Sequence, residues 1–222
     1  MRGAFIFTYL YLTDVNQYDL IEPMSSIKRG AFKMKILAIQ GSYRKNGKTS
    51  TMLRNAIKRA NELGHKVTEL NLFEKKLNYC KSCGKCDEKG QCIYTNDDIE
   101  EVTSLIKDAD VIILAAPVYW GNVPAIVKNL FDRMVGASME HTKTFPKPRL
   151  SGKRYILLTA CHTKAPFDII FGQSSGIARN VKEYFKTAGV KKIGMAVCDD
   201  TNNRETVPDK ILTKINRLVE RI

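Results

Sequence analysis

The feature that most limits the possible folds is a strand–loop–helix unit in residues 34–63. Residues 34–40 are a short apolar run of the kind found in buried strands, and residues 52–63 place apolar side chains at helical spacing. The segment 41–50 between them is rich in glycine, hydroxyl and basic residues. At a helix N-terminus such a loop offers backbone N–H groups and the positive end of the helix dipole to an anion. We therefore predict a phosphate-binding loop at residues 41–50.

The side chains of this loop add hydroxyl donors and positive charge to the backbone N–H groups. The predicted phosphate ligands are Ser42, Arg44, Lys48, Thr49 and Ser50. One alternative is a Walker A nucleotide loop, which needs four residues between its two glycines. Here five residues separate Gly41 from Gly47, and no Walker B strand is evident. The other alternative is a solvated turn between a strand and a helix.

The rest of the chain alternates strand and helix patterns. Strands are expected at 66–72, 111–116, 155–159 and 192–197, and helices at 97–106, 123–134, 177–188 and 211–222. The run 111–116 is almost purely apolar, which is typical of a strand covered on both faces. This alternation predicts an α/β fold, a doubly wound five-stranded parallel sheet with helices on both faces. Segment 137–150, with two prolines and several charges, is expected to be a loop.

Four chemically unusual segments each follow a predicted strand. They are residues 41–50, 73–96, 117–122 and 160–173. In a parallel sheet the carboxyl ends of the strands meet at one edge, where ligands bind. We therefore expect all four segments to converge on one site.

Residues 117–122 have the sequence Pro-Val-Tyr-Trp-Gly-Asn and directly follow the apolar third strand. Tyr119 and Trp120 offer an aromatic wall to a flat conjugated ligand, and Gly121 lets the backbone approach that ligand closely. The alternative is an aromatic plug that caps the sheet. A phosphate loop at the same edge favours the ligand site.

Four of the six cysteines crowd into one short segment: Cys80, Cys83, Cys86 and Cys92. Four thiolates can hold a [4Fe–4S] cluster or a zinc ion, and thiols without a metal are a third possibility. The spacing differs from that of bacterial ferredoxins, because the fourth cysteine follows after five residues and precedes Ile93 instead of proline. This cysteine usage favours metal binding in a reducing compartment over a disulfide framework, so a cytoplasmic location is expected.

Taken together, the motifs resemble those of the flavodoxin-like NAD(P)H-dependent FMN reductases. The residues that carry the resemblance are Gly-Ser-x-Arg-x-x-Gly-x-Thr-Ser at 41–50 and Pro-x-Tyr-Trp-Gly at 117–121. The cysteine motif is similar to that of the iron–sulfur flavoproteins within this group. The resemblance covers residues 34–222 and implies a flavodoxin-like strand order of 2-1-3-4-5.

The resemblance also implies where FMN binds. The phosphate falls on the loop 41–50, the flavin ring falls on Pro117, Val118, Tyr119, Trp120, Gly121 and Asn122, and a less well matched third loop falls on Ala160, Cys161 and His162. No motif for an adenylate is present, so FMN is expected over FAD. A nucleophile–base pair of Cys161 and His162 is disfavoured, because adjacent residues in an extended segment point apart.

By the same resemblance, the chain is an oxidoreductase in which FMN carries the chemistry, so no catalytic side chain is assigned. NAD(P)H or reduced ferredoxin is the expected donor, a small molecule is the acceptor, and a [4Fe–4S] cluster is a further electron carrier. A homodimer or homotetramer is expected. The alternatives are a non-enzymatic, flavodoxin-like electron carrier and, more remotely, a nucleotide-binding P-loop protein.

The net charge is +13, with 36 Lys and Arg against 23 Asp and Glu. This surplus suits phosphorylated ligands or acidic protein partners, but no nucleic-acid motif accompanies it, so no nucleic-acid partner is expected. Residues 1–33 are treated as an N-terminal extension that is loosely ordered or that precedes the working start at Met34. Its apolar stretch is too short to span a bilayer, so no membrane segment is expected. The remaining residues, 34–222, form one domain with a cysteine-rich insertion at 73–96.

Overall fold

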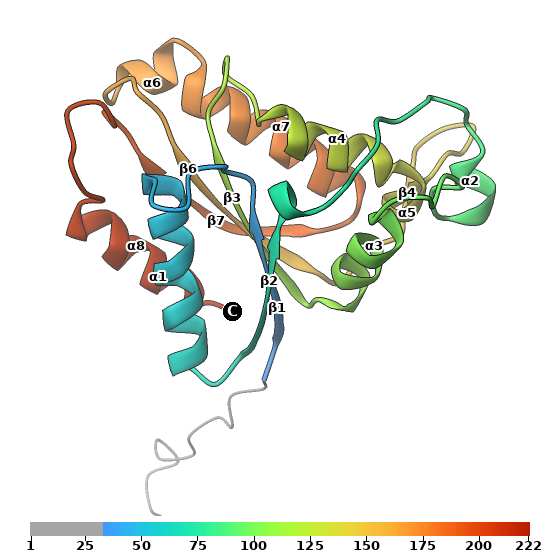
Figure 1. The fold of residues 1–222 in the computed structure, drawn as a ribbon, viewed down its shortest axis with the longest axis horizontal. Helices are drawn as coiled ribbons and strands as arrows, with labels where there is room; N and C mark the ends of the chain where they lie inside the picture. Colours follow the sequence, from blue (N-terminus) through green and yellow to red (C-terminus); the bar gives the residue numbers. More distant parts are fainter. Residues whose placement is uncertain (1–32) are drawn as a thin grey trace, which may run out of the picture. The chain divides into compact units, whose positions relative to one another are not determined.

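The computed structural model describes residues 33–222, and a five-stranded sheet lies at its centre (Figure 1). The strands are β1 (Lys35–Gln40), β2 (Lys66–Asn71), β3 (Val111–Pro117), β6 (Arg154–Ala160) and β7 (Lys191–Cys198). Their order is β2-β1-β3-β6-β7, and every neighbouring pair is parallel. Because β6 and β7 are the fourth and fifth strands of this sheet along the chain, the predicted 2-1-3-4-5 order is confirmed.

Helices cover both faces of the sheet, as predicted (Figure 1). α1 (Lys48–Glu62) and α8 (Asp209–Val219) pack on the face that carries Ile36 and Ala38 of β1. α3 (Ile99–Asp108), α4 (Ala125–Arg133) and α7 (Gln173–Thr187) pack on the opposite face, with Leu37 and Ile39. Successive residues of a strand point to opposite faces, which is why adjacent residues of β1 belong to different cores.

The third strand lies between the two helix layers and is buried from Val111 to Ala116. This burial explains why its sequence shows no polar alternation. Each fully buried Ile or Leu side chain of this strand contributes about 1.5–3 kcal/mol relative to an exposed position. The strand therefore anchors the loop that follows it.

Segment 137–150 is more regular than the predicted loop. It holds the end of the short helix α5 (Val135–Ser138) and an antiparallel hairpin of β4 (Met139–Glu140) and β5 (Lys147–Pro148). These two-residue strands are too short to produce a hydrophobic period. Similarly, α6 (Phe167–Ile170) lies inside the segment 160–173, where no helix was predicted.

The second strand ends at Asn71, one residue earlier than predicted. The side-chain oxygen of Asn71 accepts a hydrogen bond of 3.1 Å from the backbone N–H of Phe73. This bond caps the start of the short helix η2 (Leu72–Glu74). The predictions made for residues 1–32 lie outside the described residues. In the part of the chain that the structure describes, no helix is long and apolar enough to cross a membrane.

Candidate functional site

The loop after β1 presents a helix N-terminus that is ready for an anion. α1 begins after Gly47, which has an extended backbone and makes no side-chain cap, and its first turn contains no acidic residue. The N–H groups of Lys48, Thr49 and Ser50 lie in this first turn, where no intrahelical acceptor exists. Neither a side-chain cap nor an acidic residue therefore offsets the positive end of this helix dipole.

The predicted phosphate ligands differ in exposure. Ser42, Thr49 and Ser50 are buried, whereas the Lys48 side chain is half-buried and that of Arg44 is exposed. Buried hydroxyls and N–H groups thus form the floor of the loop, and the two basic side chains lie at its rim. This arrangement fits a bound phosphate group.

The Ser50 hydroxyl holds the shape of the loop. Its Oγ donates to the Arg44 carbonyl at 2.6 Å and accepts a hydrogen bond from Nε2 of Gln40. The Gln40 amide also donates to the Ser42 carbonyl at 2.9 Å. Sequence reasoning missed Gln40, although a polar residue at the end of an apolar strand is a usable signal. Since the hydroxyl of Ser50 is engaged within the loop, its backbone N–H is the group that remains to donate to a phosphate.

The segment after β3 forms a tight turn that displays its aromatic side chains. The backbones of Tyr119 and Asn122 exchange two hydrogen bonds of 2.9 Å, and Trp120 and Gly121 have positive φ angles of 53° and 68°. These angles match a type I′ turn, which strains a tryptophan but not a glycine. The Trp120 side chain is fully exposed, at 103%, and Tyr119 is 59% exposed. The turn therefore holds an aromatic surface in the open, as a flat ligand requires.

Two glycines, Gly121 and Gly176, allow close backbone contact between this turn and α7. A Cβ atom on Gly176 would lie 2.3 Å from the carbonyl oxygen of Gly121, and a Cβ on Gly121 would lie 2.8 Å from that of Gly172. Only residues without a side chain allow backbones to approach this closely. Sequence reasoning missed Gly176, because its role depends on a contact between distant parts of the chain.

The third loop brings Ala160, Cys161 and His162 to the end of β6. Cys161 is buried and His162 is exposed, so the two side chains lie in different environments. Burial, together with the carboxylates of Asp168 and Asp199, raises the pKa of Cys161 to about 12. The thiol therefore stays protonated at neutral pH, and the structure gives no support to a nucleophile at this position.

The loops after β1, β3 and β6 meet at the carboxyl edge of the sheet, as expected. The N–H of Gly41 donates to the Ala115 carbonyl at 2.7 Å, and the N–H of Val118 donates to the Ala160 carbonyl at 2.9 Å. The phosphate loop, the aromatic turn and the third loop are thus neighbours. The donors of this site fit a ligand that combines a phosphate with a flat ring.

The expectation that segment 73–96 also stays at this edge is wrong for its thiols. The segment leaves the edge at η2 and reaches α2 (Cys86–Lys89), which packs beside α5. Figure 1 shows α2 together with α5 and β4, on the side of the sheet opposite α1. A Cβ on Gly136 of α5 would lie 2.2 Å from the Cys86 carbonyl oxygen, so the two backbones are in close contact.

The four cysteines of this segment are free thiols. Cys80 and Cys83 are exposed, whereas Cys86 and Cys92 are half-buried. The N–H of Ser82 points to Sγ of Cys80 at 3.4 Å, which is the kind of contact that supports a metal-bound sulfur. Within residues 33–222 no three Cys, His, Asp or Glu side chains gather closely enough to hold one ion. Four cysteine thiols are the type of ligand that zinc and iron–sulfur clusters take, but the structure does not bring them together at one point.

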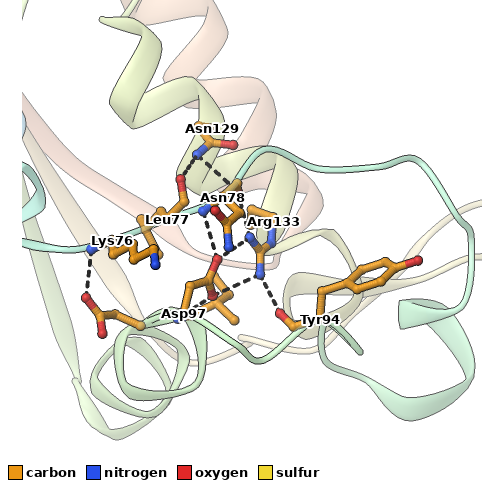
Figure 2. Close-up of polar contacts among 9 residues, drawn as sticks. Lys76, Leu77, Asn78, Tyr94, Asp97, Asn129 and Arg133 are labelled. Carbon is orange, nitrogen blue, oxygen red and sulfur yellow. Dashed lines mark hydrogen bonds and ion pairs between the residues drawn. The ribbon is translucent and has the colours of Figure 1, made fainter.

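A buried ion pair that the sequence reasoning missed fastens this segment to α4. Arg133 Nη1 lies 2.7 Å from Asp97 Oδ2 (Figure 2), and the two side chains are 1% and 0% exposed. Burial alone would raise the pKa of Asp97, but hydrogen bonds from Arg133 and from the N–H groups of Asn78 and Ile99 hold it below its usual value. The predicted helix 97–106 begins at Asp97, and a carboxylate at a helix start accounts only for the hydrogen bond from Ile99.

Comparison with known proteins identifies the fold and its relatives. The family model described as a flavodoxin-like fold matches residues 34–222. An iron–sulfur flavoprotein of Archaeoglobus fulgidus is 43% identical over 102 residues, which are 46% of each chain. An FMN-dependent NADH:quinone oxidoreductase of Yersinia enterocolitica is 34% identical over 76 residues, which are 32% of this chain and 38% of that one. The chain thus matches less than half the length of either relative.

Among solved structures, an NAD(P)H:quinone oxidoreductase from Methanothermobacter marburgensis superimposes with a TM-score of 0.68. It is 16% identical, and the superposition covers 84% of this chain and 94% of that one. At this identity the likeness shows a shared fold. The resemblance inferred from the two loop motifs and the cysteine spacing is confirmed by the family match and by the iron–sulfur flavoprotein relative.

Proposed function

The chain belongs to the flavodoxin-like family, and from this premise we propose that it is an FMN-dependent oxidoreductase. The observation that carries the proposal is the uncapped N-terminus of α1 beside an exposed aromatic turn. The first suits the terminal phosphate of FMN, and the second suits its flat ring. The relative named as an FMN-dependent oxidoreductase supports the same cofactor.

The proposed FMN site uses three loops. The phosphate is bound by Ser42, Arg44, Lys48, Thr49 and the N–H of Ser50, and the ring is bordered by residues 117–122 and 160–162. Bound FMN would supply both two-electron and one-electron transfer. The chain's own part is to fix the phosphate, to cover one side of the ring and to leave the other open to a second substrate.

The proposed donor is NAD(P)H, with reduced ferredoxin as the alternative, and the proposed acceptor is a small molecule such as a quinone. Relatives whose names state NADH or NAD(P)H and quinone support the first choice. The net charge of +13 supports docking to an acidic donor protein. A non-enzymatic electron carrier is the second candidate function, since the same site would serve it.

We further propose that Cys80, Cys83, Cys86 and Cys92 hold a [4Fe–4S] cluster, with zinc as the alternative. The support comes from the four thiols, the Ser82 contact and the iron–sulfur flavoprotein relative.

A homodimer or homotetramer is proposed, because large apolar side chains of α6 are exposed beside the aromatic turn. A cytoplasmic location agrees with the unpaired thiols.

Replacing Arg44 and Thr49 together with alanine tests the proposal. We expect FMN affinity to fall roughly 100-fold, because two donors are lost, while the melting temperature stays close to that of the parent. The double variant T213A/R217A removes the same residue types from the exposed face of α8 and serves as the control. FMN affinity is measured by equilibrium titration, and turnover is measured as NAD(P)H oxidation with a quinone.

The outcomes separate the candidate functions. Unchanged FMN affinity in the loop variant would refute the phosphate-loop assignment. A parent protein that binds FMN but does not turn over NAD(P)H with quinones would favour the electron carrier. A protein that binds nucleotide triphosphates and no flavin would favour the P-loop alternative.

A further inference from the structure

The loop that follows the last strand of the sheet, residues 199–208, was not assigned to the site by sequence reasoning. It connects β7, which ends at Cys198, to α8, which begins at Asp209. β7 lies parallel to β6, and the two strands pair up to Cys198 and Ala160. Because parallel strands end at the same edge of a sheet, loop 199–208 begins beside the third loop.

Backbone hydrogen bonds continue this pairing beyond the strands. The N–H of Cys161 donates to the Cys198 carbonyl at 3.0 Å, and the N–H of Thr201 donates to the Cys161 carbonyl at 3.2 Å. The N–H of Asp200 donates to the Thr163 carbonyl at 3.3 Å. The two loops therefore run side by side from Cys161 to Thr163.

The side chain of Asp199 adds a further contact between the two loops. Its Oδ2 accepts a hydrogen bond of 3.0 Å from the backbone N–H of Ala165. Its Oδ1 accepts one of 3.2 Å from Nη2 of Arg204, and Nε of Arg204 donates to the Asp199 carbonyl at 2.9 Å. The side chains of Asp199 and Arg204 are 14% and 25% exposed. One carboxylate oxygen thus binds the third loop, while the other is held by Arg204.

Burial contributes little to the position of this part of the third loop. Residues 162 and 164–166 are exposed, and Thr163 is half-buried. An exposed segment with few apolar contacts opens easily unless hydrogen bonds hold it. The hydrogen bonds from residues 199–201 are therefore the main restraint on residues 161–165.

This restraint matters for a ring that binds against the third loop. A loop that is loose in the free protein must be ordered by the ligand, and the cost of that ordering is subtracted from the affinity. A loop that is already held in shape avoids this cost.

We propose that Asp199 is a positioning residue for the FMN ring: its carboxylate, oriented by Arg204, holds the third loop in the shape that borders the ring. This inference rests on the proposed FMN site and adds loop 199–208 to it. Asp199 acts through the third loop and need not touch FMN. The rival explanation is that the contact stabilises the fold and has no effect on ring binding.

The test compares three variants of the full-length protein. D199A removes both carboxylate oxygens, and D199N keeps one oxygen that can accept from the Ala165 N–H. E205A removes a carboxylate from an exposed position in the same loop and is the matched control. The affinities for FMN and for riboflavin, which has no phosphate, are measured by equilibrium titration at a temperature at which every variant is folded.

We expect D199A to bind FMN about tenfold more weakly than the parent, because the ligand must then order the third loop. Riboflavin should lose affinity by the same factor, because the third loop borders the ring and not the phosphate. D199N should lose less affinity than D199A, and E205A should keep both affinities of the parent. The R44A/T49A variant of the phosphate loop should instead weaken FMN more than riboflavin.

The outcomes separate ring positioning from fold stability. A lower melting temperature of D199A, with unchanged affinities for FMN and riboflavin, would overturn the inference. A D199A variant that loses affinity for FMN but not for riboflavin would also overturn it. In both cases a parent protein that binds FMN leaves the proposed function standing, whereas a parent that binds no flavin would refute the proposed function and this inference together.

A second measurement does not depend on the folding of any variant. Hydrogen exchange of the Ala165 amide is followed by nuclear magnetic resonance in the parent protein, with and without FMN. Because Ala165 is exposed, slow exchange of its N–H reports on the bond to Asp199. We expect exchange slower than in the urea-unfolded protein, and a further decrease when FMN binds. Exchange at the unfolded rate in both states would overturn the inference.

Discussion

Residues of the same type have different structural roles at the candidate site, although the sequence predicted the same role for them. Ser42, Thr49 and Ser50 were all predicted as hydroxyl donors to a phosphate. The Ser50 hydroxyl instead holds the loop through Arg44 and Gln40. Cys161 lies among candidate ring contacts, yet it is buried and its thiol is protonated at neutral pH. Residue type therefore locates a site, but hydrogen-bond partners decide what each side chain does there.

Cys161 provides a prediction at this scale. With a pKa of about 12, only about one thiol in ten thousand is ionised at pH 8, and the side chain is buried as well. In folded, metal-free protein we expect iodoacetamide to modify the exposed Cys80 and Cys83 and to leave Cys161 unmodified, as measured by peptide mass spectrometry. Protein unfolded in urea is the control, in which all six cysteines react. Equal labelling of Cys161 and Cys80 in the folded protein would contradict the assignment.

At the scale of elements, the site depends on helices that support loops from behind. α7 meets the aromatic turn through Gly176, and α4 fastens the cysteine segment through Arg133 and Asn129. Both contacts join segments that are far apart in the sequence. The loops therefore owe their positions to helix packing as much as to their own turn residues.

The contact between α7 and the turn can be tested with the G176A variant. The added Cβ would lie 2.3 Å from the Gly121 carbonyl oxygen, so the turn and the helix must separate. We expect the free energy of unfolding to fall by about 1–3 kcal/mol and FMN affinity to fall with it. The R179A substitution at an exposed position of the same helix is the control. A G176A variant with the parent's stability and FMN affinity would show that this close approach is unimportant.

The buried pair of Asp97 and Arg133 should give stability a defined pH dependence. Removing one partner of a buried pair, as in D97N, is expected to lower the free energy of unfolding by about 3–5 kcal/mol at pH 7. The folded-state pKa of Asp97 lies below its unfolded value of about 3.9. The contribution of this ion pair to the free energy of unfolding is therefore fully present above about pH 4. It is lost as the pH falls through the folded-state pKa of Asp97.

Urea unfolding of the parent and of D97N between pH 7 and pH 3 measures this effect. We expect a constant difference in free energy from neutral pH down to about pH 4, and a shrinking difference below it. A difference that shrinks as the pH rises from 4 to 7 would have the opposite sign and would refute the assignment.

At the scale of the whole molecule, the fold followed from local patterns. The pure apolar run at 111–116 predicted the central strand, and the alternation of strands and helices predicted a parallel sheet with two helix layers. The candidate phosphate loop could be proposed from the sequence because its strand, its glycines and its helix start are contiguous. The hairpin of β4 and β5 escaped prediction because each strand has only two residues.

The features that sequence reasoning missed depend on long-range contacts. Asp97 and Arg133 are 36 residues apart, and each has an ordinary role when considered alone. Arg133 does fall on the apolar side of its helix, at helical spacing from Ile126 and Leu130, and this was the one available signal. The path of the cysteine segment away from the sheet edge has no local signal, because it is fixed by α4 and α5.

The central claim is that FMN binds between the loop 41–50 and the turn 117–122, and Trp120 can report on it directly. It is the only tryptophan of the chain, and its side chain is fully exposed. In flavin-free protein, titration with FMN should quench the tryptophan fluorescence and saturate at one FMN per chain. Riboflavin, which has no phosphate, should bind more weakly by about tenfold or more. Fluorescence that does not respond to FMN, or equal affinity for riboflavin and FMN, would contradict the account.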